Sequence, residues 1–165
     1  SKKLTPNKRE KLFDIIKSTS IYSINSISAE EIDKINILQA SLTAMKKSCE
    51  DVLSKIKNPQ NPKILVDGKI KIRNINIEQQ TIVKGDSTSA SIAAASILAK
   101  VARDTFMIAL AKDFPQYGWA QNKGYLTKAH LEAIKEYGIT KWHRKSFLKN
   151  YIQGCSFSQK KLKLD

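Results

Sequence analysis

Residues 84–104 read KGDSTSASIAAASILAKVARD, and this stretch decides the fold that the sequence predicts. Four residues recur along it at intervals of three or four: Ser89, Ala93, Ser96 and Lys100. Because small residues let a helix lie close to a neighbouring layer, this row points toward a sheet. Asp104 continues the row. We therefore predict a helix over 87–113 that packs on a sheet and brings Asp104 to the end of that sheet.

A carboxylate in that position needs a positive partner. An unpaired carboxylate away from water costs several kcal/mol, which a cation can offset. Lys100 lies one turn back and could form an ion pair with Asp104. The alternative is a divalent metal shared with Asp67, since clustered carboxylates repel one another unless a hard cation sits between them. The residues alone leave both arrangements open.

Asp67 ends the apolar run KILVD and is followed by glycine. In open α/β sheets, ligands and chemistry gather at the carboxyl ends of strands, which favours a functional aspartate. Asp-Gly is also a common turn dipeptide, so a purely local role is the competing interpretation. If both aspartates reach a shared two-metal site, their carboxylates lie within about 4–7 Å of each other.

The remaining pattern predicts an α/β chain. Helices are expected at 6–18, at 29–56 and in short pieces over 127–151, and strands at 20–27, 63–66 and 80–83, with 69–77 as a polar excursion. Strands that alternate with helices favour at least some parallel pairing. We expect one domain over 1–150 and a basic, disordered tail over 151–165.

Charge and composition limit the classes of function. The chain carries 29 Lys and Arg against 15 Asp and Glu, a formal net charge of +14. Such an excess attracts polyanions, of which nucleic acid is the commonest, although a general basic bias explains it equally well. The sequence contains no stretch apolar enough to cross a membrane, so no membrane partner is expected. Cys49 and Cys155 match no metal-ligand spacing and predict reduced thiols in a cytosolic protein.

The two histidines do not suggest a catalytic triad. Neither His130 nor His143 has a carboxylate at a telling spacing. We interpret the first as a helix-surface residue and the second as a packing residue.

Several segments occur in a telling order: SKKLTPNKRE, EIDKINILQASLTAM, VDG, VKGDSTSASIAAASILAKVARD, YGWAQNKGYLTKAH and HRKSF. Together they resemble the type 2 ribonucleases H, the ribonuclease HII family, over residues 1–148. The resemblance implies a ribonuclease H-like mixed sheet flanked by helices, with a C-terminal helical extension. It also implies an endonuclease that cuts the RNA strand of RNA–DNA hybrids and removes ribonucleotides embedded in DNA. That protein would be a monomer when complete.

The resemblance assigns roles to individual residues. It implies that Asp67 and Asp104 are catalytic and hold Mn²⁺ or Mg²⁺, and that Tyr125 packs against the sugar at an RNA–DNA junction. Backbone phosphates would be bound by Lys3, Lys84, Lys123 and Arg144. A core position is the competing interpretation of Tyr125, and Leu126 stands where the family often has glycine.

One part of the family's signature does not occur among these residues. It is Asp-Glu-x-Gly-Arg-Gly, which supplies two further metal-binding carboxylates, and we expect it upstream of Ser1. Without the two central strands of that segment, the sheet would be split, apolar helix faces would be exposed and stability would be low. The chain alone would then cleave poorly. The competing function is a catalytically inactive fragment that binds nucleic acid non-specifically.

Overall fold

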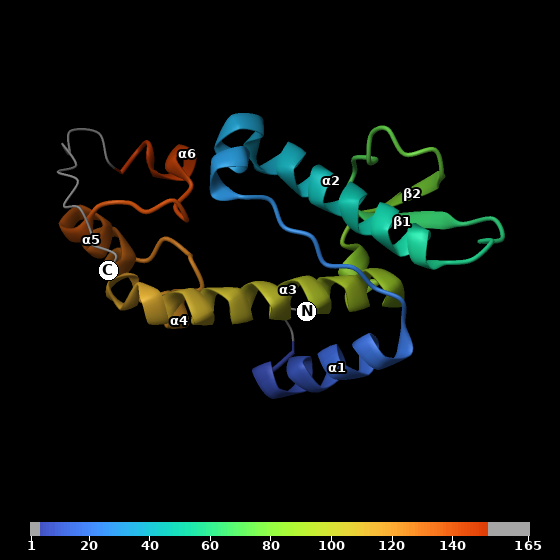
Figure 1. Cartoon of the computed structure of the whole chain (residues 1–165), viewed down its shortest axis with the longest axis horizontal. Helices are drawn as coiled ribbons and strands as arrows, with labels where there is room; N and C mark the ends of the chain where they lie inside the picture. The colour runs from blue at the N-terminus through green and yellow to red at the C-terminus, as the bar shows by residue number, and fades with distance from the viewer. Residues whose placement is uncertain (1–3, 152–165) are drawn as a thin grey trace. The chain divides into compact units, whose positions relative to one another are not determined.

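The computed structural model describes residues 4–151 (Figure 1). Lys3, the predicted tail from 152 onward and Cys155 lie outside the described residues. The elements follow in this order: α1 (Pro6–Thr19), α2 (Ala29–Lys55), β1 (Lys63–Asp67), β2 (Glu78–Ile82), a 3-10 turn (Gly85–Ser87), α3 (Ala90–Asp113), a second 3-10 turn (Pro115–Tyr117), α4 (Trp119–Asn122), α5 (Lys128–Tyr137) and α6 (Lys145–Leu148). The predicted α/β class is confirmed.

Two compact units make up the described chain. The sheet unit contains the residues up to Ile27 together with Ile37–Ala102, and the helical unit contains Ser28–Asn36 together with the residues from Arg103 onward. Each unit has its own core and is described by itself. The prediction of one domain over 1–150 stays a prediction.

The sheet unit is built around one pair of parallel strands. β1 and β2 pair from Lys63 opposite Glu78 to Asp67 opposite Ile82, which confirms the predicted parallel pairing. Helix α2 lies over the strands (Figure 1), and Leu42 of the helix, Val66 of β1 and the buried Ile72 form the core cluster. The excursion between the strands contains no further strand, as predicted, and the Gln79 side chain holds it with two hydrogen bonds to the Ile72 backbone.

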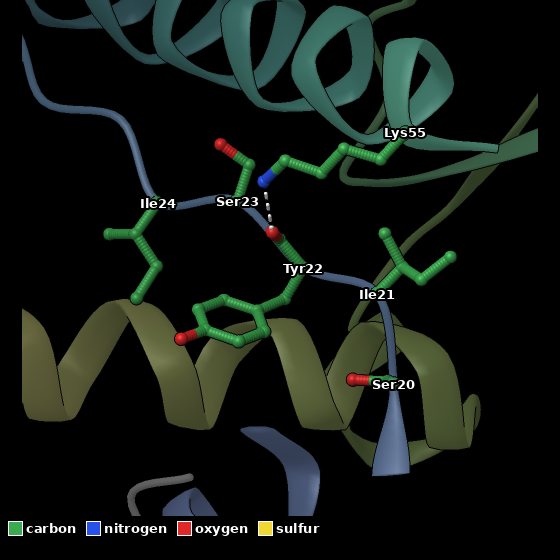
Figure 2. A pocket seen from close by; sticks show the side chains of 6 residues that line it. All are labelled: Ser20, Ile21, Tyr22, Ser23, Ile24 and Lys55. Atoms are coloured by element: carbon green, nitrogen blue, oxygen red, sulfur yellow. Dashed lines mark hydrogen bonds between the residues drawn. The ribbon is translucent and has the colours of Figure 1, made fainter. Parts of the chain in front are cut away.

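The predicted strand at 20–27 is wrong. Within residues 4–151 this segment joins no sheet, and α2 side chains, among them Lys55 (Figure 2), bind its polar groups instead. Lys55 donates to the Tyr22 carbonyl at 3.0 Å, and the Asp51 carboxylate accepts from the Ser23 and Asn25 side chains at 2.7 and 2.8 Å. Alternation of apolar and polar residues describes which way side chains point, but a strand also needs a partner backbone. Residues 20–24 and Lys55 line a shallow pocket here, with no acidic residue among them.

Helix α2 matches the predicted range but is interrupted. Its start is capped as expected, because the Ser28 hydroxyl accepts from the Glu31 amide at 3.1 Å. At Asn36 the backbone leaves the helical region, with φ 68° and ψ 164°. This conformation is essentially restricted to glycine, so Asn36 is strained. The break coincides with the point where the chain passes from the helical unit to the sheet unit.

The helical unit has an aromatic core. Tyr117 and Trp119 stack with ring centroids 5.0 Å apart, and Met107, Ile134 and Leu148 are buried in the same cluster. These residues come from α3, α5, α6 and the two short helical turns after α3. The short helical pieces predicted over 127–151 are confirmed as α5 and α6.

Some large apolar side chains remain exposed on the two long helices. Ile37 and Leu38 on α2 and Phe106 and Ile108 on α3 are 45–47% exposed. The prediction that missing central strands expose apolar helix faces stays a prediction. The described residues form a sheet of two strands, and the larger ribonuclease H-like mixed sheet stays a prediction.

The break at Asn36 predicts an inverted preference between glycine and alanine. In an ordinary helix position alanine stabilises by about 1 kcal/mol relative to glycine. At Asn36 we expect Asn36→Gly to have a free energy of unfolding about 1 kcal/mol higher than Asn36→Ala, because only glycine adopts this backbone without strain. Both variants lose the same side chain, so urea unfolding isolates the backbone effect. Ser41, an exposed helical position in α2, is the control. There we expect the alanine variant to have a higher free energy of unfolding than the glycine variant. If the glycine variant were the less stable one at both positions, the strained break at Asn36 would be contradicted.

Candidate functional site

Asp67 lies at the carboxyl end of β1 and is held by a backbone amide. Its Oδ1 accepts from the Gly85 N–H at 2.9 Å. The following residue, Gly68, has φ 113°, and its amide donates to the Ile82 carbonyl at 2.9 Å, which continues the ladder past Asp67. Asp67 itself is exposed. One carboxylate oxygen is therefore fixed by the protein in a position that solvent reaches.

The turn that contains Gly85 leaves little room for a side chain. A Cβ at Gly85 would lie 2.5 Å from Cδ1 of Ile92 and 3.4 Å from Oδ1 of Asp67. The Gly85 carbonyl accepts from the amides of Thr88 and Ser89 at 3.1 and 2.8 Å, so the same residue starts the turn that leads into α3. Strand end, turn and helix start are thus tied together at one residue without a side chain.

Lys84 precedes this turn in the left-handed region, with φ 56°, and is exposed. It is the one predicted phosphate-binding residue in the sheet unit that the structure describes, and it is adjacent to the Asp67 contact through Gly85. Its predicted role stays a prediction.

Asp104 follows Arg103 on α3 and is partly buried. It belongs to the helical unit, whereas Asp67 belongs to the sheet unit. The predicted approach of the two carboxylates stays a prediction. Among residues 4–151, no three His, Cys, Asp or Glu side chains gather into a metal-binding group.

The structure brings Arg103, Lys123 and Tyr125 together in the helical unit. The Arg103 guanidinium donates to the Lys123 carbonyl at 3.5 Å and would lie 3.2 Å from a Cβ at Gly124. Gly124 has φ 78°, so its lack of a side chain permits both the turn and the close guanidinium. The Lys123 ammonium donates to the Ala120 carbonyl. The Lys123 ammonium therefore lies against the backbone of α4.

Tyr125 is displayed on a well-ordered turn. The Asn122 side chain accepts from the Gly124 amide at 2.8 Å and donates to the Tyr117 carbonyl at 2.7 Å, and the Tyr125 amide donates to the Asn122 carbonyl at 2.8 Å. The Tyr125 side chain is nevertheless 63% exposed. The interpretation of Tyr125 as a core residue is wrong.

Arg144 lies in the same unit and is held on an aromatic ring. Its guanidinium carbon is 3.8 Å from the centroid of Phe147, within the range of a cation–π contact. Burial lowers the pKa of Arg144, and the neighbouring Arg103 guanidinium lowers it further, whereas Asp33 and Tyr125 raise it. Arg103, Tyr125 and Asp33 are therefore the charged or titratable groups that act on Arg144. Arginine remains protonated at neutral pH in any case.

Arg103 and Asp33 are the two residues of this region that sequence reasoning missed. In the sequence, Arg103 directly precedes Asp104, and Asp33 follows two other acidic residues, Glu30 and Glu31. No local pattern in the sequence indicates that either one contacts a distant loop.

The two histidines form a buried pair. His130 is 3% exposed and His143 is 8% exposed, and their Nε2 atoms are 3.2 Å apart. The helix-surface interpretation of His130 is wrong, because its face of α5 packs against Tyr117 and Trp119. The packing interpretation of His143 is confirmed.

Hydrogen bonds assign the protons of this pair. The Thr140 amide donates to Nδ1 of His143 at 3.0 Å, so the proton of His143 is on Nε2 and is donated to Nε2 of His130. His130 then carries its proton on Nδ1, which is buried without a partner among the described residues. Burial lowers the pKa of both imidazoles. For His143, burial together with the neighbouring His130 lowers the pKa to about 4. Both rings are neutral at neutral pH, which suits a structural role.

The described cysteine is a free thiol. Cys49 packs beside the core of the sheet unit, and burial raises its pKa, with Glu50 adding to the effect. Its thiol therefore stays protonated at neutral pH and is a weak nucleophile.

Comparison with known proteins identifies relatives over most of the chain. Residues 1–150 match the family model described as Ribonuclease HII. The chain is 50% identical over 153 residues to a ribonuclease HII of Acetivibrio thermocellus, which covers 92% of this chain and 57% of that relative. It is 49% identical over 154 residues to a ribonuclease HII of Fusobacterium nucleatum, covering 93% and 71%, and 50% identical over 155 residues to one of Caldanaerobacter subterraneus, covering 93% and 62%. The chain thus spans roughly three fifths to seven tenths of the length of these relatives.

No helix within the described part of the chain is long and apolar enough to cross a membrane.

The buried histidine pair predicts a loss of stability in mild acid. In the unfolded chain a histidine takes up a proton near pH 6.5, whereas folded His143 does so only near pH 4. The unfolded state therefore binds more protons in this window, and the free energy of unfolding falls as the pH falls from 6.5 toward 4. We expect His143 alone to account for a loss of about 2 kcal/mol between pH 7 and pH 5.

Urea unfolding followed by tryptophan fluorescence checks this, because both tryptophans, Trp119 and Trp142, lie in the helical unit. His143→Asn keeps an acceptor for the Thr140 amide and removes the titrating ring. This variant should be less stable at pH 7 but lose less stability between pH 7 and pH 5. An identical pH dependence in wild type and variant would contradict the assignment of a neutral, buried His143.

Proposed function

Because the chain belongs to the ribonuclease HII family, we propose that it acts in the hydrolysis of the RNA strand of RNA–DNA hybrids and in the removal of ribonucleotides embedded in DNA. The observation that carries this proposal is the exposed Tyr125 beside Arg103 and Arg144 in one folded unit. An aromatic ring that is displayed rather than buried gives a flat apolar face for a sugar or base, and the flanking guanidinium groups attract phosphates.

In this proposal, arginine and lysine side chains bind the backbone phosphates. A guanidinium presents donors in a planar fork that matches two phosphate oxygens, and Arg144 is pre-oriented by its contact with Phe147. Lys84 and Lys123 add positive charge near Asp67 and Tyr125, respectively, and the net charge of +14 raises the local concentration of any polyanion. Such contacts position a duplex without reading its sequence. Lys3, which we assign to the same role, lies outside the described residues.

Asp67 and Asp104 are the proposed ligands of Mn²⁺ or Mg²⁺. Hard divalent cations prefer oxygen ligands, and Asp67 fits this chemistry because it is exposed and has one oxygen fixed by the Gly85 amide. A bound pair of such ions would activate a water molecule and stabilise the leaving oxygen in phosphodiester hydrolysis. The contribution of this chain is to hold the Asp67 carboxylate in one orientation at the end of β1.

Metal binding at Asp67 can be tested without an activity assay. Mn²⁺ is paramagnetic, so an ion at the Asp67 carboxylate should broaden the Gly85 amide resonance of the ¹⁵N-labelled chain, because that amide is hydrogen-bonded to the same carboxylate. Asp67→Asn should abolish the broadening. Asp51→Asn is the matched control, because the Asp51 carboxylate already accepts hydrogen bonds from Ser23 and Asn25. This variant should show the same broadening of the Gly85 resonance as wild type. Broadening that survives Asp67→Asn would contradict the assignment of Asp67 as a ligand.

Removal of the Tyr125 ring should weaken duplex binding. We expect Tyr125→Ala to lower affinity for an RNA–DNA hybrid about tenfold, in the range of one lost stacking contact, whereas Tyr125→Phe keeps the ring and stays close to wild type. Fluorescence anisotropy with a labelled hybrid measures both. Equal affinities of the alanine variant and wild type would contradict the proposed interface.

Charge reversal at the neighbouring segment tests the phosphate contacts. Arg144→Glu combined with Lys145→Glu should weaken binding and reduce the slope of log affinity against log salt by roughly 1 to 2, about one for each lost phosphate contact. Lys135 is an exposed lysine on α5, and Lys135→Glu is the control for the change in charge that each of the two substitutions makes. If the double variant binds as tightly and with the same slope as wild type, Arg144 and Lys145 do not contact the phosphates of the hybrid.

A further inference from the structure

Helix α6 cannot cap its own start. The residue at its N-cap is Arg144, which makes no side-chain capping hydrogen bond. A helix of this length leaves its first amides without acceptors inside the helix, so they need acceptors from elsewhere. The residue that supplies them comes from the far end of the sequence.

Asp33 of α2 provides these acceptors. Its Oδ2 accepts from the Lys145 amide at 2.7 Å, and its Oδ1 accepts from the Ser146 amide at 2.9 Å and from the Ser146 hydroxyl. Both partners belong to the helical unit, as does Asp33, although 112 and 113 positions separate them along the chain. One carboxylate thus does for α6 what a local serine or aspartate does for most helices.

The Asp33 carboxylate is ionised at neutral pH. Burial raises its pKa, but the hydrogen bonds from the Ser146 hydroxyl and from the amides of Ser146 and Lys145 outweigh that effect and leave the pKa below its ordinary value. Hydrogen bonds to an ionised acceptor are roughly twice as strong as those between neutral groups. This contact is therefore a firm anchor for the start of α6.

Arg144 lies directly between two anchors. On its C-terminal side, Asp33 holds the amides of Lys145 and Ser146. On its N-terminal side, the buried His143 is fixed by the Thr140 amide and by His130. The Arg144 backbone is consequently restricted on both sides, while its side chain rests on Phe147 and remains partly accessible. The Asp33 charge also raises the pKa of Arg144, against the effect of Arg103.

We propose that Asp33 is a positioning residue for nucleic-acid binding: its carboxylate caps α6 and thereby fixes Arg144 in the orientation that contacts a backbone phosphate. This inference rests on the proposed function, in which Arg144 is a phosphate-binding residue. It gives a common physical role to two segments, EIDKIN and HRKSF, that are far apart in the sequence. Since the oxygens of Asp33 are occupied by three donors, its negative charge is offset locally rather than presented to an incoming phosphate.

A double-mutant cycle between Asp33 and Arg144 separates positioning from general stability. Four forms of the whole chain are compared: wild type, Asp33→Ala, Arg144→Ala and the double variant. Affinity for a labelled RNA–DNA hybrid is measured by anisotropy at a temperature at which circular dichroism shows all four to be folded. We expect Arg144→Ala to weaken binding about tenfold and Asp33→Ala about fivefold, in the range of a lost charge-assisted contact. In the Arg144→Ala background, Asp33→Ala should have no further effect on affinity, although it still lowers stability.

Two further variants sharpen the result. Glu30→Ala removes one negative charge from the same helix, where Glu30 forms an exposed ion pair with Lys34 at 2.7 Å, and should leave affinity unchanged. Ser146→Ala removes one of the three donors to Asp33 and should weaken binding about twofold, again only when Arg144 is present. This milder variant keeps the test decisive if Asp33→Ala does not fold.

The outcomes distinguish the two levels of the proposal. If wild type binds the hybrid and Arg144→Ala weakens binding, but the Asp33 and Ser146 variants act equally in both backgrounds or not at all, the positioning role of Asp33 is overturned and the proposed function stands. If wild type does not bind the hybrid, or Arg144→Ala has no effect, the proposed function of this surface fails and the inference fails with it.

Discussion

The hydrogen bond from the Gly85 amide to the Asp67 carboxylate is the contact on which the sheet unit depends. It joins the carboxyl end of β1 to the turn that starts α3, at a glycine where an added Cβ would lie 2.5 Å from Cδ1 of Ile92. The same bond fixes one oxygen of the proposed metal ligand. One backbone amide therefore serves both the fold and the proposed site.

The helical unit uses the same device at two other places. Asn122 arranges the backbone that displays Tyr125, and Asp33 caps the short helix that follows Arg144. In each case a partly buried polar side chain satisfies backbone groups of a loop, and a side chain that we propose to be functional projects from that loop. The order of the proposed interface thus comes from capping and turn contacts, while the aromatic cluster around Tyr117 forms the core of the unit. A ligand that meets such a surface loses little affinity to the ordering of loops.

Sequence reasoning succeeded where local chemistry decides the structure. The run KILV followed by Asp-Gly identified β1 and its end, and Thr5 with Pro6 identified the start of α1, where Thr5 accepts from the Lys8 amide. It failed where distant parts of the chain decide. Residues 20–27 have a strand's alternation but no partner backbone within the described chain, and the break of α2 at Asn36 leaves no trace in a helical pattern. The contact of Asp33 with Ser146 spans most of the chain, so no local pattern could reveal it.

The Gly85 amide is hydrogen-bonded to the Asp67 carboxylate, and hydrogen exchange of that amide reports on this bond. In the wild-type chain, the Gly85 amide should exchange at least about tenfold more slowly than an unstructured amide, since a buried, bonded amide exchanges only when the structure opens. In Asp67→Ala this protection should be lost at Gly85, while the amide of Ala93, which is bonded to the Ser89 carbonyl within α3, keeps its protection. A Gly85 amide that exchanges freely in wild type, or that stays equally protected without the Asp67 carboxylate, would contradict the account.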